Sequence, residues 1–353
     1  MIENIKELRE HLEREIKKSS RVFIVGHDVP DLPDIDAIGS AMALHELATY
    51  YGKEAYIVLG CDESKIDPLL KSVIDRNREA FHIIRKKDFL ELANKKSLLI
   101  LSDVNKSDRI SIGDSLDRVG HTMIIDHHNE GPTTVPTKGK YISLGSSSAS
   151  EIMSMVFFGG KIPMSTEVAN NLLAGIYVDS KNFEFNTTEF THEMRKRLIK
   201  IGANPELANN FLKDEYETYC RVKKLVINGT IFKKYSDSIN APINVAFTLN
   251  REKPKQIYFK TDFAKAANDL VNLSGVNAGF AMGYVEPGVV QISARSGKRV
   301  NIVKIMDAMG GGGNAQLGGG RFVTDDIFAL ENELMGKVQL GIMEEPDEPQ
   351  TQK

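Results

Sequence analysis

Short apolar runs that alternate with helical patterns constrain the fold of this 353-residue chain more than any other feature of its sequence. Four such runs lie in the first half of the chain, at residues 21–26, 54–59, 97–103 and 122–126. Strands that are apolar throughout and separated by helices are typical of a parallel sheet with helices on both faces. The sequence therefore predicts an α/β fold that begins with a parallel-sheet domain.

Helical periodicity then dominates until about residue 228, where the pattern changes. The clearest helices are predicted at residues 167–179, 191–202 and 205–224. After Gly229, we expect strands at residues 230–235, 243–249, 277–285 and 289–294, and helices at residues 261–273, 300–309 and 326–343. This mixed order predicts a second, smaller α/β unit.

The predicted organisation is therefore two domains. Residues 1–228 form the first domain, with a helical linker at about 188–228, and residues 229–343 form the second. Residues 344–353 carry charge and proline without an apolar pattern, so we expect them to form a disordered tail.

Net charge limits the kinds of binding partner that we expect, and cysteine content indicates the cellular compartment. The formal net charge is −3, which argues against a long nucleic acid as partner but leaves room for a small nucleotide. Cys61 and Cys220 have no paired-motif spacing, as expected in a reducing cytoplasm. The sequence shows no apolar stretch of bilayer-spanning length and no signal-peptide pattern. We expect a cytoplasmic chain, or the cytoplasmic catalytic part of a longer membrane protein.

Acidic residues and histidines follow the predicted strands of the first domain. These groups are the loop from His27 to Asp36, then Asp103, then Asp126-His127-His128, and Asp179 after the apolar residues 174–178. The carboxyl ends of strands in a doubly wound sheet share one edge, where ligands bind, so we expect the four groups to converge. A single Asp after a strand is more often a helix cap, so only the combination indicates a site.

Converging carboxylates repel one another and require a cation. Carboxylate oxygens and imidazoles without thiolates suit Mn²⁺ or Mg²⁺ better than a structural zinc site. Two such ions can share a bridging carboxylate and activate a water for attack on phosphorus. The pattern therefore favours a phosphoesterase that uses a pair of divalent cations.

The motifs of the first domain resemble those of the DHH phosphoesterases. Asp126-His127-His128 is similar to the signature of that family. Gly26-His27 followed by residues 33–40 is similar to its first motif, and Asp103 and Asp179 resemble its second and fourth. The resemblance covers nearly the whole chain, in the same order.

The second domain extends this resemblance. The glycines at residues 310–313 with Asn314, preceded by residues 293–296, resemble the DHH-associated C-terminal domain. Residues 173–183 are especially similar to the catalytic region of the GdpP-type cyclic di-AMP phosphodiesterases. Residues 146–150 also match a loop of the family, in which Ser148 is expected to cap the following helix.

The resemblance implies a role for each residue of these motifs. One Mn²⁺ would be held by His27, Asp34 and Asp103, and the other by Asp36, Asp103, His127 and Asp179. Asp103 would bridge the two ions, for which Mg²⁺ or Co²⁺ could substitute. Asp126 would orient His127, and His128 would face the scissile phosphate, which makes Asp103 and His128 the expected catalytic residues. The implied substrate contacts are Ser293, Arg295, Gly311, Gly312, Gly313 and Asn314.

Two positions depart from the family pattern. The first motif carries three extra residues, so that Pro-Asp occurs twice and either Asp31 or Asp34 could be the first carboxylate ligand. We favour Asp34, because its spacing to Asp36 and to the helix start is the usual one. Asn314 stands where relatives have a histidine, and an amide cannot carry the charge of an imidazolium.

The implied reaction is manganese-dependent hydrolysis of cyclic di-AMP to the linear dinucleotide 5′-pApA by a metal-activated water. The active site would lie in a cleft between the two domains, and the family suggests a homodimer. One alternative is a nanoRNase, which degrades short linear oligonucleotides, or a pAp phosphatase of the same family. A manganese pyrophosphatase is a more distant alternative, disfavoured by the arginine and glycine elements. A third is a catalytically weakened module that binds cyclic dinucleotides for regulation.

Overall fold

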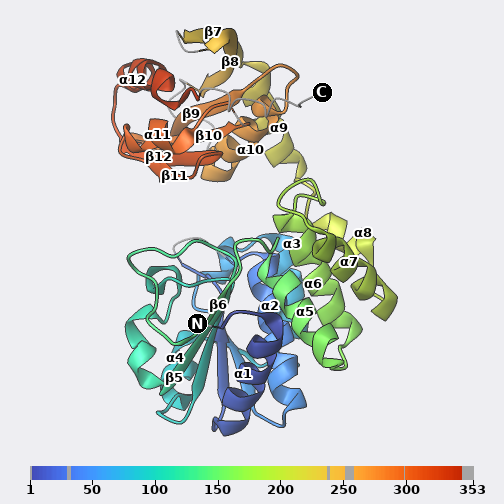
Figure 1. The fold of residues 1–353 in the computed structure, drawn as a ribbon. Coiled ribbons are helices and arrows are strands. Elements are labelled where there is room, and N and C mark those ends of the chain that lie inside the picture. Colours follow the sequence, from blue (N-terminus) through green and yellow to red (C-terminus); the bar gives the residue numbers. More distant parts are fainter. Residues whose placement is uncertain (1, 30–32, 237–238, 251–257, 298, 344–353) are drawn as a thin grey trace. The chain divides into compact units, whose positions relative to one another are not determined.

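The structure is a computed structural model that describes residues 2–29, 33–236, 239–250, 258–297 and 299–343 (Figure 1). The chain divides into two compact units, Met1–Lys213 and Asp214–Lys353, and each is described by itself. The alternative ligand Asp31 and the predicted tail at residues 344–353 lie outside the described residues. The predicted α/β fold is confirmed, because a parallel sheet in the first unit is followed by a second, separate sheet.

The sheet of the first unit has six strands, all parallel, in the order β3-β2-β1-β4-β5-β6. The strands are β1 (Val22–Val25), β2 (Ala55–Val58), β3 (Ile83–Ile84), β4 (Leu98–Ser102), β5 (His121–Asp126) and β6 (Gly139–Ile142). The order reverses between β1 and β4, so the loops after these two strands diverge and leave a crevice. The four strands that the sequence predicts are all present, and the sequence analysis did not identify β3 and β6.

Side chains of the strands alternate between two cores. Ile24 and Ile100 belong to the larger core, on the face covered by α2, α5 and α6, whereas Val25 and Leu101 belong to the core on the opposite face. Because both faces are covered, the strands are apolar at almost every position. Only the strand ends are therefore available for polar chemistry.

The helices of the first unit are α1 (Ile5–Lys18), α2 (Ile35–Tyr50), α3 (Pro68–Asn77), α4 (Lys86–Leu92), α5 (Ala149–Gly160), α6 (Thr166–Asp179), α7 (Glu189–Ile201) and α8 (Pro205–Asn210). Helix α2 is buried on nearly every side, because it packs on the sheet and also against α5 and α6. Gly39 allows the close approach to α6, since a Cβ atom there would come within 2.7 Å of the Asn171 carbonyl oxygen. The N-terminal ends of α2 and α5 and the C-terminal end of α6 supply residues of the site described below.

The second unit contains a six-stranded sheet in the order β11-β12-β10-β9-β8-β7, antiparallel except between β8 and β9. Its strands are β7 (Thr230–Ser236), β8 (Ile239–Asn250), β9 (Ala278–Glu286), β10 (Val289–Ser296), β11 (Gly312–Gly313) and β12 (Leu317–Val323). Its helices are α9 (Tyr216–Ile227), α10 (Lys260–Val271), α11 (Ile302–Asp307) and α12 (Ile327–Gly341). Helices α11 and α12 cover one face of the sheet, and α9 and α10 pack on the other.

The single helix predicted at residues 205–224 is wrong, because the structure contains two helices there, α8 and α9. Ala208 of α8 packs in the core of the first unit. Val222 and Leu225 of α9 pack against Phe263 of the second unit. The segment between the two helices contains the boundary between the units, which therefore lies before the predicted boundary near residue 228. None of the described helices combines the length and apolarity needed to span a membrane.

Candidate metal centre

Three of the four chemistry-bearing segments leave neighbouring strands at the same edge of the first sheet. His27 follows β1, Asp103 follows β4, and Asp126 ends β5, and these strands pair as β1-β4-β5. Asp103 has a φ of +60°, a left-handed conformation that Asp tolerates better than most residues. Its N–H donates to the Ile125 carbonyl at 2.9 Å, which fixes this turn against β5.

Asp34 and Asp36 are held by the first turn of α2. Asp34 is the N-cap, and its Oδ1 accepts hydrogen bonds from the N–H groups of Asp36 and Ala37 at 2.9 and 3.0 Å. An Asp at this position satisfies backbone donors that the helix itself cannot. The cap leaves the second oxygen of Asp34 facing His27.

Asp179 reaches the site from a helix, and the prediction that it follows a strand end like the other groups is wrong. It is the last residue of α6. The apolar residues before it are buried because α6 packs on α2. Gly175 permits this contact, since a Cβ atom there would come within 2.6 Å of Oδ1 of Asp36.

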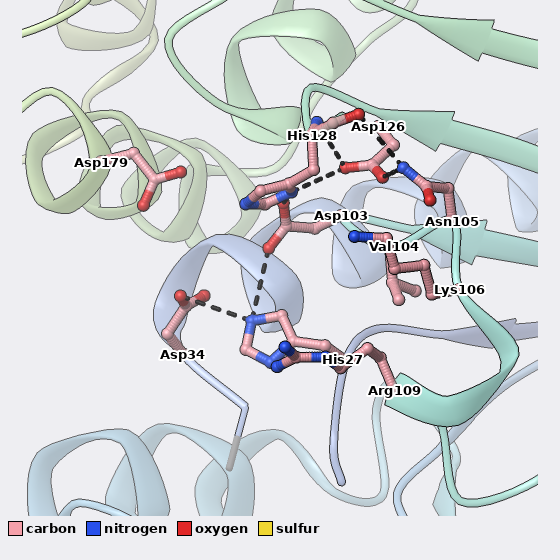
Figure 2. A pocket seen from close by; sticks show the side chains of 10 residues that line it. All are labelled: His27, Asp34, Asp103, Val104, Asn105, Lys106, Arg109, Asp126, His128 and Asp179. Atoms are coloured by element: carbon pink, nitrogen blue, oxygen red, sulfur yellow. Dashed lines mark hydrogen bonds and ion pairs between the residues drawn. The ribbon is translucent and has the colours of Figure 1, made fainter. Parts of the chain in front are cut away.

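The structure brings the predicted ligands together in two groups that share Asp103. Figure 2 shows the first group, in which His27 lies between Asp34 and Asp103. In the first group, Nε2 of His27 lies 3.4 Å from Oδ2 of Asp34 and 3.5 Å from Oδ2 of Asp103. In the second, Nε2 of His127 lies 3.2 Å from Oδ1 of Asp103, 3.1 Å from Oδ2 of Asp179 and 3.9 Å from Oδ2 of Asp36. Each group holds its donor atoms within 4.8 Å of one another.

Asp36 is fully buried and is held by the N-terminal end of α5. Its Oδ2 accepts a hydrogen bond from the N–H of Ala149, and its Oδ1 accepts one from the N–H of Ser150, both at 2.8 Å. Ser148 caps this helix as expected, with its side chain accepting from the N–H of Glu151. The unpaired amides and the dipole of a helix N-terminus stabilise a negative charge at this position.

Asp126 organises the two histidines that follow it. Its Oδ1 accepts from the backbone N–H groups of His127 and His128, and it lies 2.9 Å from Nδ1 of the His128 ring. Its Oδ2 accepts from the side-chain amide of Asn105 at 2.6 Å. The same amide donates to the His128 carbonyl at 3.1 Å, and the amide oxygen of Asn105 accepts from the hydroxyl of Thr134. Asn105 therefore joins the carboxylate and the backbone of this turn in one network.

The protonation of the cluster reflects its burial and its crowded charges. Burial and the neighbouring charge of Asp36 raise the pKa of Asp103 well above its usual value and that of Asp179 to about 8. Burial alone would lower the pKa of His127, but the nearby carboxylates of Asp103 and Asp179 raise it to about 12. Burial is likewise outweighed at His27 by Asp34, which raises the pKa to about 10. The crowded carboxylates therefore favour a positive charge among them.

The donor atoms fit a pair of divalent cations. Oδ1 of Asp103 and Nε2 of His127 are buried and have no hydrogen-bond partner among the described residues, although buried polar atoms normally have one. Both groups consist of carboxylate oxygens and imidazole nitrogens, the donors that suit Mn²⁺. A cation in the second group would give both of these buried atoms the partner that they lack.

A cavity of about 270 Å³ opens beside the cluster. Cluster residues line it, including His128, whose side chain is largely exposed. Asn105, Lys106 and Arg109, on the segment that continues from Asp103, also line the cavity (Figure 2). The lining therefore combines carboxylates with two basic side chains, those of Lys106 and Arg109.

The structure brings the predicted substrate contacts of the second unit together on three adjacent strands. Ser293 and Arg295 lie on β10, where they pair with Gly319 and Leu317 of β12. Gly312 and Gly313 form β11, which pairs with β12 in turn, and Gly311 directly precedes it. Asn314 closes the turn, with its amide oxygen accepting from the N–H groups of Gln316 and Leu317. Contact between Asn314 and a substrate would therefore depend on its amide nitrogen.

Arg295 is the main cationic group of this arrangement. Its guanidinium donates to the carbonyl of Ala294 at 2.8 Å, and burial lowers its pKa. No acidic partner of Arg295 is found in the described part of the chain. A half-buried guanidinium without a carboxylate partner among the described residues is suited to bind an external anion.

Sequence analysis did not identify Asn105, Lys106 or Arg109. Lys106 and Arg109 follow a predicted ligand on an irregular segment, where no periodicity indicates a direction for the side chain. Asn105 could have been suspected only from its position two residues after Asp103. These residues become visible only when the segment is seen to line the cavity.

The chain is similar to known proteins of the DHH family in its N-terminal part and to longer relatives over most of its length. A sequence profile described as the DHH family, N-terminal domain, matches residues 21–176. The chain is 28% identical over 304 residues to a protein named cyclic-di-AMP phosphodiesterase GdpP from Bacillus subtilis (strain 168), which covers 85% of this chain and 44% of that protein. It is 27% identical over 334 residues to a protein named cyclic-di-AMP phosphodiesterase PdeA from Listeria monocytogenes. That match covers 93% of this chain and 48% of the relative. The chain thus spans less than half the length of these two relatives.

Among solved structures, a match is an exopolyphosphatase-related protein from Bacteroides fragilis. The TM-score is 0.70 at 19% identity, and the match covers 94% of this chain and 96% of that one. This likeness establishes the fold and leaves the reaction to be inferred from the site.

Proposed function

We propose that this chain, whose residues 21–176 match the DHH family and which is similar to the GdpP-type proteins, is a manganese-dependent phosphodiesterase that hydrolyses cyclic di-AMP to 5′-pApA. The observation that carries the proposal is the sharing of Asp103 between two groups of potential metal ligands. A carboxylate in this position can bridge two cations, which is the arrangement used for in-line displacement at phosphorus. Because two relatives are named cyclic-di-AMP phosphodiesterases, the cyclic dinucleotide is the substrate to test first.

The two groups of donor atoms support the ligand sets that the sequence motifs imply. His27, Asp34 and Asp103 would hold one Mn²⁺, and Asp36, Asp103, His127 and Asp179 would hold the other. When bound, the two ions would supply a water activated for attack and would neutralise charge on the phosphoryl oxygens. Mg²⁺ or Co²⁺ could substitute for Mn²⁺.

The remaining residues of the site would orient the histidines and bind the substrate. Asp126 fixes the backbone and ring of His128, so that the exposed His128 faces the cavity and can donate to the scissile phosphate. Asp126 also fixes the backbone of His127 and thereby the direction of its ring. In the second unit, Ser293, Arg295 and the amides of Gly311, Gly312 and Gly313 would bind the nucleotide, and Asn314 would contribute its amide nitrogen.

The test is hydrolysis by the purified chain after metal removal with EDTA. Cyclic di-AMP, pApA, pAp and pyrophosphate are each incubated with and without Mn²⁺, and products are separated by chromatography. We expect cyclic di-AMP to be converted to pApA only with Mn²⁺. Preferential cleavage of pApA or pAp would replace the cyclic substrate by a linear one, and release of phosphate from pyrophosphate alone would exclude a phosphodiesterase. Binding of cyclic di-AMP without any hydrolysis in Mn²⁺ would identify a regulatory module instead.

A further inference from the structure

The segment from Asn105 to Arg109 supplies the two basic side chains of the cavity lining, and its position is fixed by the backbone. The N–H of Ser107 donates to the Thr133 carbonyl at 3.0 Å, and the N–H of Val135 donates to the Asn105 carbonyl at 2.8 Å. Lys106 lies opposite Thr134 in the short antiparallel pairing that results. The segment therefore does not need to be ordered by a ligand before it can bind one.

The side chain of Lys106 lies over Gly131. A Cβ atom at Gly131 would come within 3.1 Å of Cε of Lys106, so the absence of a side chain there leaves room for the lysine stem. The carbonyl of Arg109 accepts from the N–H of Asp28 at 3.0 Å, which attaches the end of the segment to the loop that carries His27. Lys106 and Arg109 are thus held on the same framework as the ligands.

The ammonium group of Lys106 makes no hydrogen bond or ion pair with the residues that the structure describes. The nearby carboxylate of Asp108 accepts a hydrogen bond from the hydroxyl of Thr133 and none from Lys106. This hydrogen bond lowers the pKa of the Asp108 carboxyl, and the charge of Lys106 helps to lower it. Lys106 is only partly exposed and lines the cavity. A cation that is pre-positioned at a cavity wall without an internal partner is available to an anionic ligand.

The distribution of charge in the cavity indicates which phosphate of the substrate Lys106 would bind. The scissile phosphate belongs at the ligand clusters, where the cations would balance its charge. Among the described residues that line the cavity, Lys106 and Arg109 are the only lysine and arginine, so a further phosphate of the same substrate that stays within this cavity would be balanced by them.

We propose that Lys106, with Arg109 beside it, binds a second, non-scissile phosphate of the substrate. This inference rests on the proposed phosphodiesterase function and defines its substrate class further. The preferred substrates carry two phosphates, as in a cyclic dinucleotide or a linear dinucleotide with a 5′ phosphate. A diester with a single phosphate reacts at the same centre but gains nothing from Lys106.

The experiment compares Lys106→Met with the unchanged chain in Mn²⁺ on three substrates. Cyclic di-AMP and pApA have two phosphates, whereas bis(p-nitrophenyl) phosphate has only the scissile one. We expect kcat/KM to fall roughly 10- to 100-fold on the two-phosphate substrates, mainly through KM, and less than about threefold on the single-phosphate diester. Lys106→Arg should restore most of the loss because it keeps the charge.

Lys138→Met is the matched control, because Lys138 is an exposed lysine that does not line the cavity. An equal loss on all three substrates would overturn the proposal, since Lys106 would then act on the scissile phosphate or on the fold. An unchanged KM on the two-phosphate substrates would overturn it as well. If the unchanged chain cleaves pApA and the diester but leaves cyclic di-AMP intact, the proposed substrate fails while the comparison of pApA with the diester still decides the role of Lys106.

Discussion

The two units differ in the chemistry that they offer. All eight histidines lie in the first unit and none in the second: His11, His27, His45, His82, His121, His127, His128 and His192. The first unit presents side chains from strand ends and helix termini whose positions the core fixes, whereas the second presents Arg295 and backbone amides of glycine-rich strands. The proposed metal ligands thus all lie in the first unit, whereas Arg295 and the glycine-rich strands of the second unit are proposed to contact only the substrate, so substitutions at the two places should change different measured constants.

Of the substitutions considered, Asp103→Asn should lower turnover the most. A small effect would contradict the contrast between a metal-binding first unit and a substrate-binding second unit. Asn keeps the left-handed backbone and the size of the side chain but removes the bridging charge. We expect kcat to fall roughly 10³-fold or more, because metal coordination supplies several kcal/mol of transition-state stabilisation. Steady-state kinetics with titrated Mn²⁺ measures this loss.

The same variant has a second, opposite expectation. Asp103→Asn removes repulsion between buried carboxylates, so the metal-free protein should be at least as stable to heat as the unchanged chain. Asp114→Asn, at an exposed position, is the control. Full turnover of Asp103→Asn at saturating Mn²⁺ would refute the assignment of the bridging ligand.

Arg295→Met tests the second unit by itself. We expect KM to rise roughly 10- to 150-fold, the range for loss of a hydrogen bond to a charged group, with Mn²⁺ affinity unchanged. Isothermal titration with Mn²⁺ and kinetics with cyclic di-AMP measure the two constants separately. A change in Mn²⁺ affinity would show that the two kinds of binding are coupled.

Asn105→Ala should have a moderate effect confined to the first unit. It removes the donor to Asp126 and to the His128 carbonyl, so the two histidines lose part of their orientation. Loss of such a supporting contact weakens metal affinity or activity about 10-fold. Mn²⁺ titration should reveal the change, and Asn105→Asp should weaken the site more, because it places a second carboxylate beside Asp126.

Acid should destabilise the first unit slightly, through a histidine remote from the site. His45 of α2 is buried beside the rings of Phe81 and His82, and burial together with the charge of His82 lowers its pKa to about 4. The unfolded chain, with a pKa near 6.5, binds the proton more readily, so stability that is present above about pH 6.5 is lost as the pH falls towards 4. Between about pH 7.5 and about pH 5.5 the loss is about 1 kcal/mol.

Urea unfolding at the two pH values measures this loss, followed by amide exchange in the core of the first unit. His45→Leu should remove the contribution of this residue and leave the remaining pH dependence unchanged. An identical pH dependence in the variant and in the unchanged chain would show that His45 is not the group responsible.

Sequence patterns could predict the first unit well, because its buried strands are continuous apolar runs with polar residues directly after them. They could not predict β3 and β6, which are short edge strands, or β12, whose three successive glycines have no strand propensity. The predicted helix at residues 167–179 is confirmed, but its last turn is apolar like a buried strand, so the apolar run alone wrongly groups Asp179 with the strand ends. Motif resemblance placed the ligands in two sets, but Asn105 and Lys106 depended on how an irregular segment turns.

The contact between Asp36 and α5 has a consequence for how occupancy of the centre can be observed. The same carboxylate that is proposed to bind a cation holds the amides of Ala149 and Ser150. A bound ion that immobilises this carboxylate must also slow the opening of the first turn of α5, since the two events share one partner. Exchange of these two amide hydrogens with heavy water therefore reports filling of the centre, even in a variant that has lost all turnover.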